Sequence, residues 1–153
     1  MSETIISTLI LGVSGLLITA YYNHSNKRLA NDKMTKELFK EFNERYDELN
    51  DKLDAISQNF KSLQELEENP ELKHKLTDYF NLCAEEYFWY KKGRIDKEIW
   101  NAWNDGMNDW YNLSIVFKDA WDEEIEKNGC KSYYIKSKND FFKYRSNKNG
   151  ALV

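Results

Sequence analysis

The residues able to act as metal ligands or nucleophiles are few and lie far apart in the sequence. The chain has two histidines, His24 and His74, and two cysteines, Cys83 and Cys130. Glu71 and His74 have the E-x-x-H spacing that places both side chains on one face of a helix. Four-helix di-metal sites need two such motifs and two further carboxylates, and His24 cannot supply the second because it adjoins an apolar segment. The sequence therefore predicts no metal site.

Motifs for cofactor binding and covalent catalysis are also missing from the sequence. It contains no C-x-x-C pair, no P-loop and no G-x-G-x-x-G turn. Cys83 falls within an apolar helical stripe and is interpreted as a small buried hydrophobic residue; a disulfide with Cys130 would require an oxidising compartment. Two acidic runs, 85–86 and 122–124, are interpreted as solvated helix faces. We therefore expect no catalytic residue, no cofactor and no enzymatic activity.

Composition and charge indicate a helical protein that does not bind nucleic acid specifically. The 153 residues include 6 glycines and 1 proline, too few turn formers for a many-stranded fold. The net charge is −4, and an acidic body disfavours contact with a phosphate backbone. Residues 130–153 carry six basic residues and one acidic residue, and a solvated terminus is favoured there over a nucleic-acid or lipid contact. The predicted fold class is all-α.

A long uncharged segment near the N-terminus predicts a transmembrane helix. Residues 4–22 contain no charged side chain, and a helix of this length extends about 28 Å, close to the thickness of the hydrocarbon core. Tyr21 and Tyr22 lie where interfacial aromatic residues are expected. A cleaved signal peptide fits less well, because the segment lacks a basic start and a small-residue cleavage site; a buried helix of a soluble protein is the remaining alternative. Residues 1–23 are predicted to anchor the chain in the lipid bilayer.

The charges that flank this segment predict its orientation. No Lys or Arg precedes it, whereas Lys27, Arg28, Lys33 and Lys36 follow it. Basic flanks stay on the cytoplasmic side of a membrane. We therefore expect a single-pass protein of the inner (plasma) membrane with its C-terminal body in the cytoplasm.

Residues 24–68 are predicted to form a basic juxtamembrane segment followed by a helical stalk. Apolar residues recur in the stalk at alternating steps of three and four, as in the a and d positions of a coiled coil. Two interpretations remain open: pairing between chains, and packing of the helix on its own domain. For pairing between chains, the candidate oligomerisation residues are Phe42, Leu49, Leu53 and Ile56.

Residues 69–145 are predicted to form a compact helical hairpin or bundle. Asn69 is a typical helix N-cap, and Pro70 suits the first helical position. Gly93 can adopt the left-handed conformation that ends this helix. Asp96 is then expected to cap a second helix.

The remainder of this domain is predicted to contain a break and a short last helix. The second helix is expected to kink or restart near 112–114 and to end at 128–129. A final helix is expected over 138–145, and residues 146–153 are expected to be a disordered tail. The aromatic residues predicted to dock from the final helix are Phe141, Phe142 and Tyr144.

Aromatic residues make up 15% of the chain, and all five tryptophans lie between 89 and 121. Filling a small core is the favoured interpretation, and a docking surface for a protein partner is the alternative. On a helical wheel, Phe88 and Trp89 point away from the apolar stripe of their own helix. Coverage by another helix of the chain is favoured over an exposed patch. The candidate partner-binding residues are Phe88, Trp89, Trp100 and Trp103.

Three parts of this domain are distinctive: the stretches Tyr79 to Tyr87 and Tyr90 to Asp96, and the set Trp100, Trp103 and Gly106-Met107. On these residues the chain, over about residues 70–145, resembles a family of small, uncharacterised bacterial proteins that have an N-terminal anchor, a helical stalk and an aromatic helical domain. Some members are associated with mobile elements and phage defence. The resemblance implies this layout and no particular reaction.

These features predict a membrane-tethered, non-enzymatic interaction protein, with an accessory or effector role in phage defence as one possible process. The alternative is a membrane-active or superinfection-excluding protein that acts through its transmembrane helix. The expected partners are the lipid bilayer and either another protein or a second copy bound through the stalk.

Overall fold

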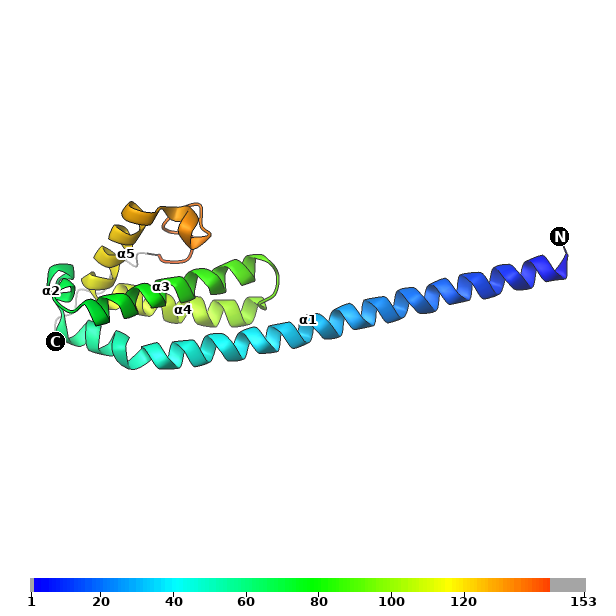
Figure 1. Cartoon of the computed structure of the whole chain (residues 1–153), viewed down its shortest axis with the longest axis horizontal. Coiled ribbons are helices and arrows are strands. Elements are labelled where there is room, and N and C mark those ends of the chain that lie inside the picture. Colours follow the sequence, from blue (N-terminus) through cyan, green and yellow to red (C-terminus); the bar gives the residue numbers. More distant parts are fainter. Residues whose placement is uncertain (1, 144–153) are drawn as a thin grey trace. The chain divides into compact units, whose positions relative to one another are not determined.

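The computed structural model describes residues 2–143, and of residues 3–6 and 9 it describes the backbone alone (Figure 1). Every regular element among these residues is helical, so the predicted all-α class is confirmed. The elements are α1 (Glu3–Asn59), α2 (Leu63–Glu67), α3 (Pro70–Lys91), α4 (Lys97–Leu113), α5 (Ile115–Asn128) and the short 3₁₀ helix η1 (Cys130–Tyr133).

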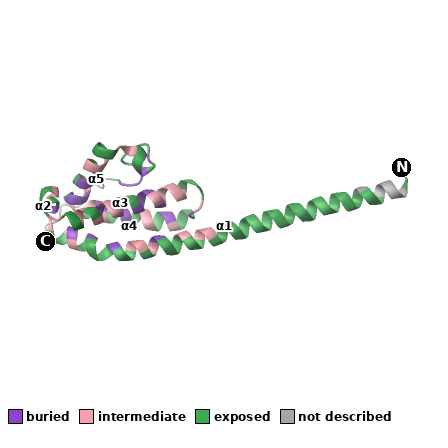
Figure 2. Ribbon diagram, in the orientation of Figure 1, coloured by how far each residue is buried: buried purple, intermediate pink, exposed green. Residues whose placement is uncertain are grey.

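The chain divides into two units, residues 1–37 and residues 38–153. The predicted boundary between stalk and helical domain, at 68/69, differs from this division, because residues 38–59 at the end of α1 belong to the second unit. In the first unit the described side chains from Ile10 to Lys33 are all exposed, as the continuous green surface of this helix shows in Figure 2.

The transmembrane helix predicted for residues 4–22 is found as helix, but its span across a membrane is not confirmed. Within the described part of the chain, no helix combines the length and the apolar character needed to cross a membrane. Residues 4–6 and 9 of the predicted span have side chains outside the described ones. The membrane anchor therefore stays a prediction.

The boundaries of α3, α4 and α5 form where the sequence predicts them, whereas the predicted stalk helix is interrupted at 60–62, between α1 and α2. Asn69 accepts a hydrogen bond from the Leu72 amide at 3.2 Å and caps α3, and Asp96 caps α4 through the Glu98 amide at 2.7 Å. Ser114 separates α4 from α5, which confirms the predicted restart. The polypeptide turns after α3 at a glycine in the left-handed region, Gly93 with φ +66°.

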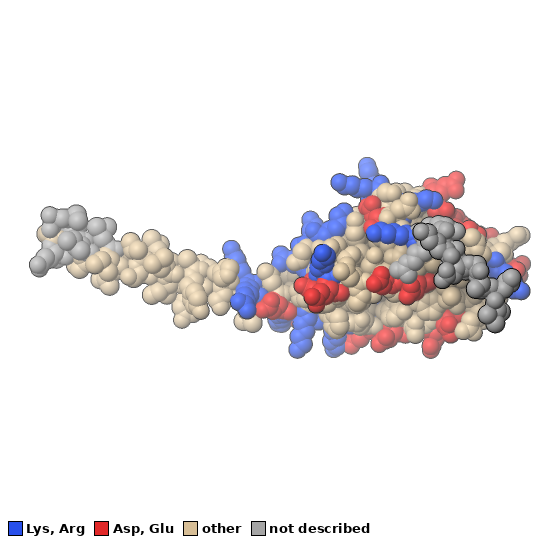
Figure 3. Space-filling model, turned by 180° about the vertical axis from the view of Figure 1, so that it is seen from behind, with Lys and Arg blue, Asp and Glu red and all other residues tan. Residues whose placement is uncertain are grey.

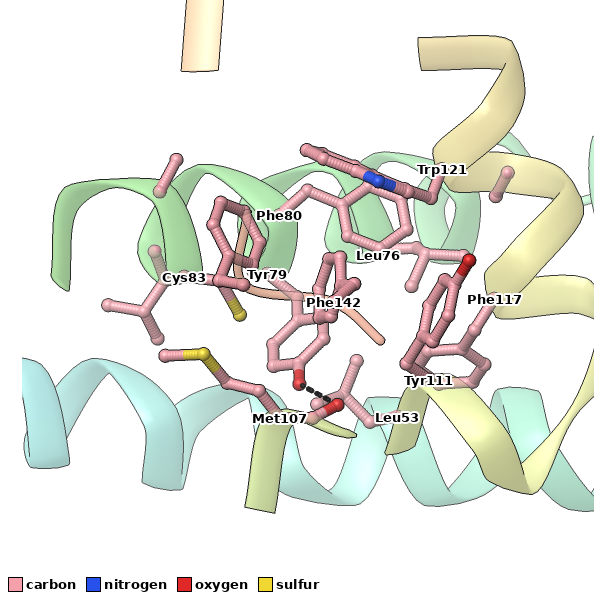
Figure 4. Close-up of a cluster of buried hydrophobic side chains, with 14 of the residues drawn as sticks. Leu53, Leu76, Tyr79, Phe80, Cys83, Met107, Tyr111, Phe117, Trp121 and Phe142 are labelled. Carbon is pink, nitrogen blue, oxygen red and sulfur yellow. Dashed lines mark hydrogen bonds between the residues drawn. The ribbon is translucent and has the colours of Figure 1, made fainter. Parts of the chain in front are cut away.

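The end of α1 packs into the core of the second unit. Phe42, Leu49, Leu53 and Ile56 are at most 7% exposed and belong to one hydrophobic cluster with residues of α3, α4 and α5. Figure 4 shows Leu53 among side chains of those helices. The heptad pattern therefore reflects packing within the chain, and these four residues are not available to pair with a second chain. Their assignment as oligomerisation residues is corrected accordingly.

The helix predicted over 138–145 is not formed in its described part. Residues 138–143 are turns, bends and irregular chain, although Phe141 and Phe142 dock in the core as predicted, at 1% and 0% exposed. The main chain here forms hydrogen bonds with side chains of α4. The Phe141 carbonyl accepts from Asn104 and Asn108, and the Lys143 amide donates to Asn108. Groups used in this way cannot form the ladder of a helix. Tyr144 and the predicted tail 146–153 lie outside the described residues.

Candidate functional site

Two of the four candidate partner-binding residues are parts of the packed aromatic core. Trp100 is buried, and its ring stacks on Tyr90 with 4.8 Å between centroids and 10° between planes. Trp103 is half-buried and stacks on Phe39, with centroids 5.7 Å apart. Trp100 is therefore not on the surface and cannot contact a partner in this fold, which corrects its assignment.

Phe88 and Trp89 are both half-buried. Trp89 packs against the hydrophobic core. The Phe88 ring lies 5.1 Å from that of Tyr134, and the Lys92 ammonium lies 5.4 Å from its centre. Phe88 is thus covered by Tyr134, a residue that follows η1 and has a left-handed φ of +56°, and not by another helix of the chain, as the sequence analysis favoured.

A cavity of about 160 Å³ lies between α1, α3 and α4 within the second unit. Its walls are mostly apolar and aromatic, with polar groups at a few positions. The cavity is partly open to solvent, and Ala102 in its lining is an exposed residue. The lining residues are Asn43, Tyr46, Tyr79, Leu82, Cys83, Glu86, Ala102, Trp103, Gly106 and Met107.

Glu86 is the acidic residue of this cavity. Its side chain is 6% exposed and accepts no hydrogen bond from any described residue. No side-chain oxygen in the described part of the chain is both fully enclosed and unpartnered, so the Glu86 oxygens keep some accessible surface, and Glu86 is a lining residue of the cavity. Burial raises the pKa of Glu86 to about 8; Arg45 opposes this shift and Glu85 adds to it. The carboxyl group is therefore mostly protonated at neutral pH while the cavity holds no cation.

The other polar groups of the cavity are neutral. The Tyr79 hydroxyl donates a long hydrogen bond, 3.5 Å, to the Met107 carbonyl (Figure 4). The Tyr46 hydroxyl accepts from the Trp110 indole nitrogen at 2.8 Å. Burial raises the pKa of Tyr79 and of the Cys83 thiol well above their ordinary values, so Cys83 is a thiol and a poor nucleophile.

An ion pair beside the cavity joins α1 to α3. Arg45 Nη1 lies 2.6 Å from Glu85 Oε2 and Nη2 lies 3.3 Å from Oε1, a two-point contact. The guanidinium also lies 5.8 Å from the centre of the Phe42 ring. Because Arg45 bonds to Glu85 in this way, the neighbouring Glu86 has no cation hydrogen-bonded to it.

The assignment of Glu85 and Glu86 to a solvated face is wrong for Glu86 and only partly correct for Glu85, which is half-exposed. A sequence signal for Glu86 did exist. It follows Tyr79 by seven residues and Cys83 by three, which places it on the buried stripe of α3. The charge of its side chain masked this position, because ionisable residues are seldom buried.

No known protein family matches the sequence, and neither a curated protein nor a solved structure is detectably similar to it.

Proposed function

We propose that the chain is a membrane-tethered, non-enzymatic interaction protein, held in the bilayer by residues 4–22, with the second unit in the cytoplasm. One observation carries the proposal: the described part of this segment is uncharged and exposes large apolar side chains. Leu11, Leu16 and Tyr21 are 74%, 73% and 71% exposed. Figure 3 shows no charged side chain on the visible face of the described part of this segment, before the basic residues that follow it.

The distribution of these side chains around the helix supports a lipid environment. At 100° per residue, Leu11, Val13 and Leu16 project in three different directions, so the apolar surface is not a single stripe. A helix that is apolar all round belongs in a protein core or in a membrane. Among the described residues of the first unit there is no second element to cover this surface, which favours lipid.

A topology experiment tests both the membrane tether and the side of the membrane on which the C-terminus lies. The full-length chain is expressed with a C-terminal green fluorescent protein or, separately, with a C-terminal alkaline phosphatase. The basic residues 27–36 should keep the C-terminus inside, so membranes should carry fluorescence and the phosphatase should be inactive. Active phosphatase would contradict the cytoplasmic placement, and fluorescence confined to the soluble fraction would contradict the tether.

The tether differs from the alternative, a membrane-active protein, in what residues 4–22 do. A tether can be replaced by an unrelated transmembrane helix without loss of the cellular phenotype, and it should not release calcein from lipid vesicles. Dye release by the full-length chain, lost when the helix is exchanged, would support the membrane-active function instead. A role in phage defence rests on the family resemblance alone, and the test is protection of cells against infection by the full-length gene.

A further inference from the structure

The cavity of the second unit has the size of a small organic molecule. An apolar protein cavity of about 150 Å³ accommodates benzene, and the cavity here is about 160 Å³. A branched molecule of about five non-hydrogen atoms is smaller than benzene and fits this volume. Because the cavity is partly open to solvent, such a molecule can enter without unfolding the unit.

The residues that line the cavity favour a positively charged ligand. Three aromatic residues, Tyr46, Tyr79 and Trp103, line the cavity together with one acidic residue, Glu86. Aromatic faces attract organic cations, and a buried carboxylate is stable only when it is paired. The groups also fit a metal ion poorly, because hard divalent cations take six or more oxygen ligands.

We propose that this cavity binds a small alkylammonium ion, whose nitrogen pairs with the Glu86 carboxylate and whose carbon atoms contact the aromatic walls. The site does not depend on the proposed membrane tether, since all lining residues belong to the second unit.

The charged groups around Glu86 are consistent with an added cation. On α3 the neighbour is Glu85, which is negative, and on α1 it is Arg45, which bonds to Glu85. The α4 side of the lining consists of Ala102, Trp103, Gly106 and Met107, none of which is charged. A cation that pairs with Glu86 therefore replaces its proton, and the positive group that acts on Glu86, Arg45, is bonded to Glu85 and is not part of the lining.

Binding should accordingly be linked to release of a proton. The pKa of Glu86 is about 8 in the absence of a cation, and pairing with an ammonium group lowers it. Between pH 6 and pH 8 the affinity should rise about tenfold per pH unit and then level off. The ammonium group itself keeps its charge throughout this range, because its pKa is near that of lysine, about 10.4.

The experiment is isothermal titration of the full-length protein, in a nonionic detergent, with isobutylammonium and with isobutanol, its neutral counterpart of the same shape. Isobutylammonium should bind, and isobutanol should bind at least about tenfold more weakly, since its hydroxyl group cannot form an ion pair with the Glu86 carboxylate. Glu86→Gln should weaken isobutylammonium binding to the same degree. The matched control is Glu126→Gln on the exposed surface of α5, which should bind as the unmodified chain does.

Three results would overturn the proposal: no heat of binding with isobutylammonium, equal affinity for isobutanol, or unchanged affinity in Glu86→Gln. Circular dichroism shows whether Glu86→Gln is folded. If that variant is unfolded, the comparison of the two ligands and the pH dependence of the unmodified chain still decide the question. A pH-independent affinity between pH 6 and pH 8 would also contradict pairing with Glu86.

Discussion

Asn108 bonds from within α4 to the main chain on both sides of Phe142. Its Nδ2 donates to the Phe141 carbonyl at 2.9 Å, and its Oδ1 accepts from the Lys143 amide at 2.6 Å. Asn108 is itself buried. One side chain thus satisfies two main-chain groups of an irregular segment and helps to hold Phe141 and Phe142 in the core.

Replacing Asn108 should therefore destabilise the second unit. Asn108→Leu keeps the size of the side chain but leaves the Lys143 amide without this acceptor, at a cost of about 1–3 kcal/mol. Urea denaturation of residues 38–153 measures the change in the free energy of unfolding. The matched control is Asn101→Leu, at an exposed position of the same helix, which should change stability little. Equal effects of the two substitutions would show that the bonds of Asn108 do not hold the segment.

Packing of the heptad residues within the chain makes a second prediction. Leu53 is fully buried, so Leu53→Ala should lower the free energy of unfolding of residues 38–153 by about 2–5 kcal/mol. Leu113→Ala is the matched control, because Leu113 lies on the surface at the end of α4. The same segment should sediment as a monomer. A stable dimer that dissociates on Leu53→Ala, with each chain still folded, would restore the coiled-coil interpretation.

The pH dependence of stability should report the burial of Glu86. Its pKa is about 8 in the folded chain against a usual value of 4.5, so the folded state binds more protons than the unfolded state between these two pH values. Stability should consequently fall as pH rises from 4.5 to 8, with a contribution from this group of up to about 1.4 kcal/mol per pH unit.

Glu86→Gln removes this contribution, so the variant should gain stability relative to the unmodified chain as pH rises, and the gain should level off above pH 8. The measurement is urea denaturation at several pH values, with Glu126→Gln as control. The free energy of unfolding of the Glu126→Gln control should change with pH as that of the unmodified chain does. If the stability of Glu86→Gln also followed that of the unmodified chain at every pH, the Glu86 carboxyl group would be ionised in the folded state.

Phe88 and Trp89 should differ in their effect on stability. Trp89 packs against the core, whereas Phe88 contacts the exposed Tyr134. Trp89→Ser should therefore cost about 2 kcal/mol and Phe88→Ser about 1 kcal/mol or less, in proportion to the apolar surface that each buries. The melting temperatures of the two variants of residues 38–153 show which substitution costs more stability. If Phe88→Ser leaves the melt unchanged but abolishes a cellular phenotype, Phe88 is part of a docking surface.

The local features of the fold could be predicted from the sequence because they depend on neighbouring residues. Asn69 and Asp96 cap helices, and Gly93 and Ser114 interrupt them, whatever the tertiary structure. The heptad pattern likewise predicted that Leu53 is buried. It could not predict what covers Leu53, because a helix of the same chain and a second chain require the same apolar stripe.

The features that the sequence did not reveal depend on contacts between distant segments. Residues 138–143 have the aromatic spacing of a short helix, but bonds to Asn104 and Asn108 hold them in an irregular conformation. The cavity around Glu86 is formed by α1, α3 and α4 together. Its acidic residue lies on the buried stripe of α3, and its charge led to the opposite interpretation.

Extraction of isolated membranes with alkaline carbonate tests the central claim, the membrane tether, most directly. The full-length chain should remain in the membrane pellet, because residues 4–22 would lie in the hydrocarbon core. Residues 38–153, expressed alone, are the matched control and should be found in the supernatant. Release of the full-length chain into the supernatant would contradict the tether and favour a covered helix in a soluble assembly.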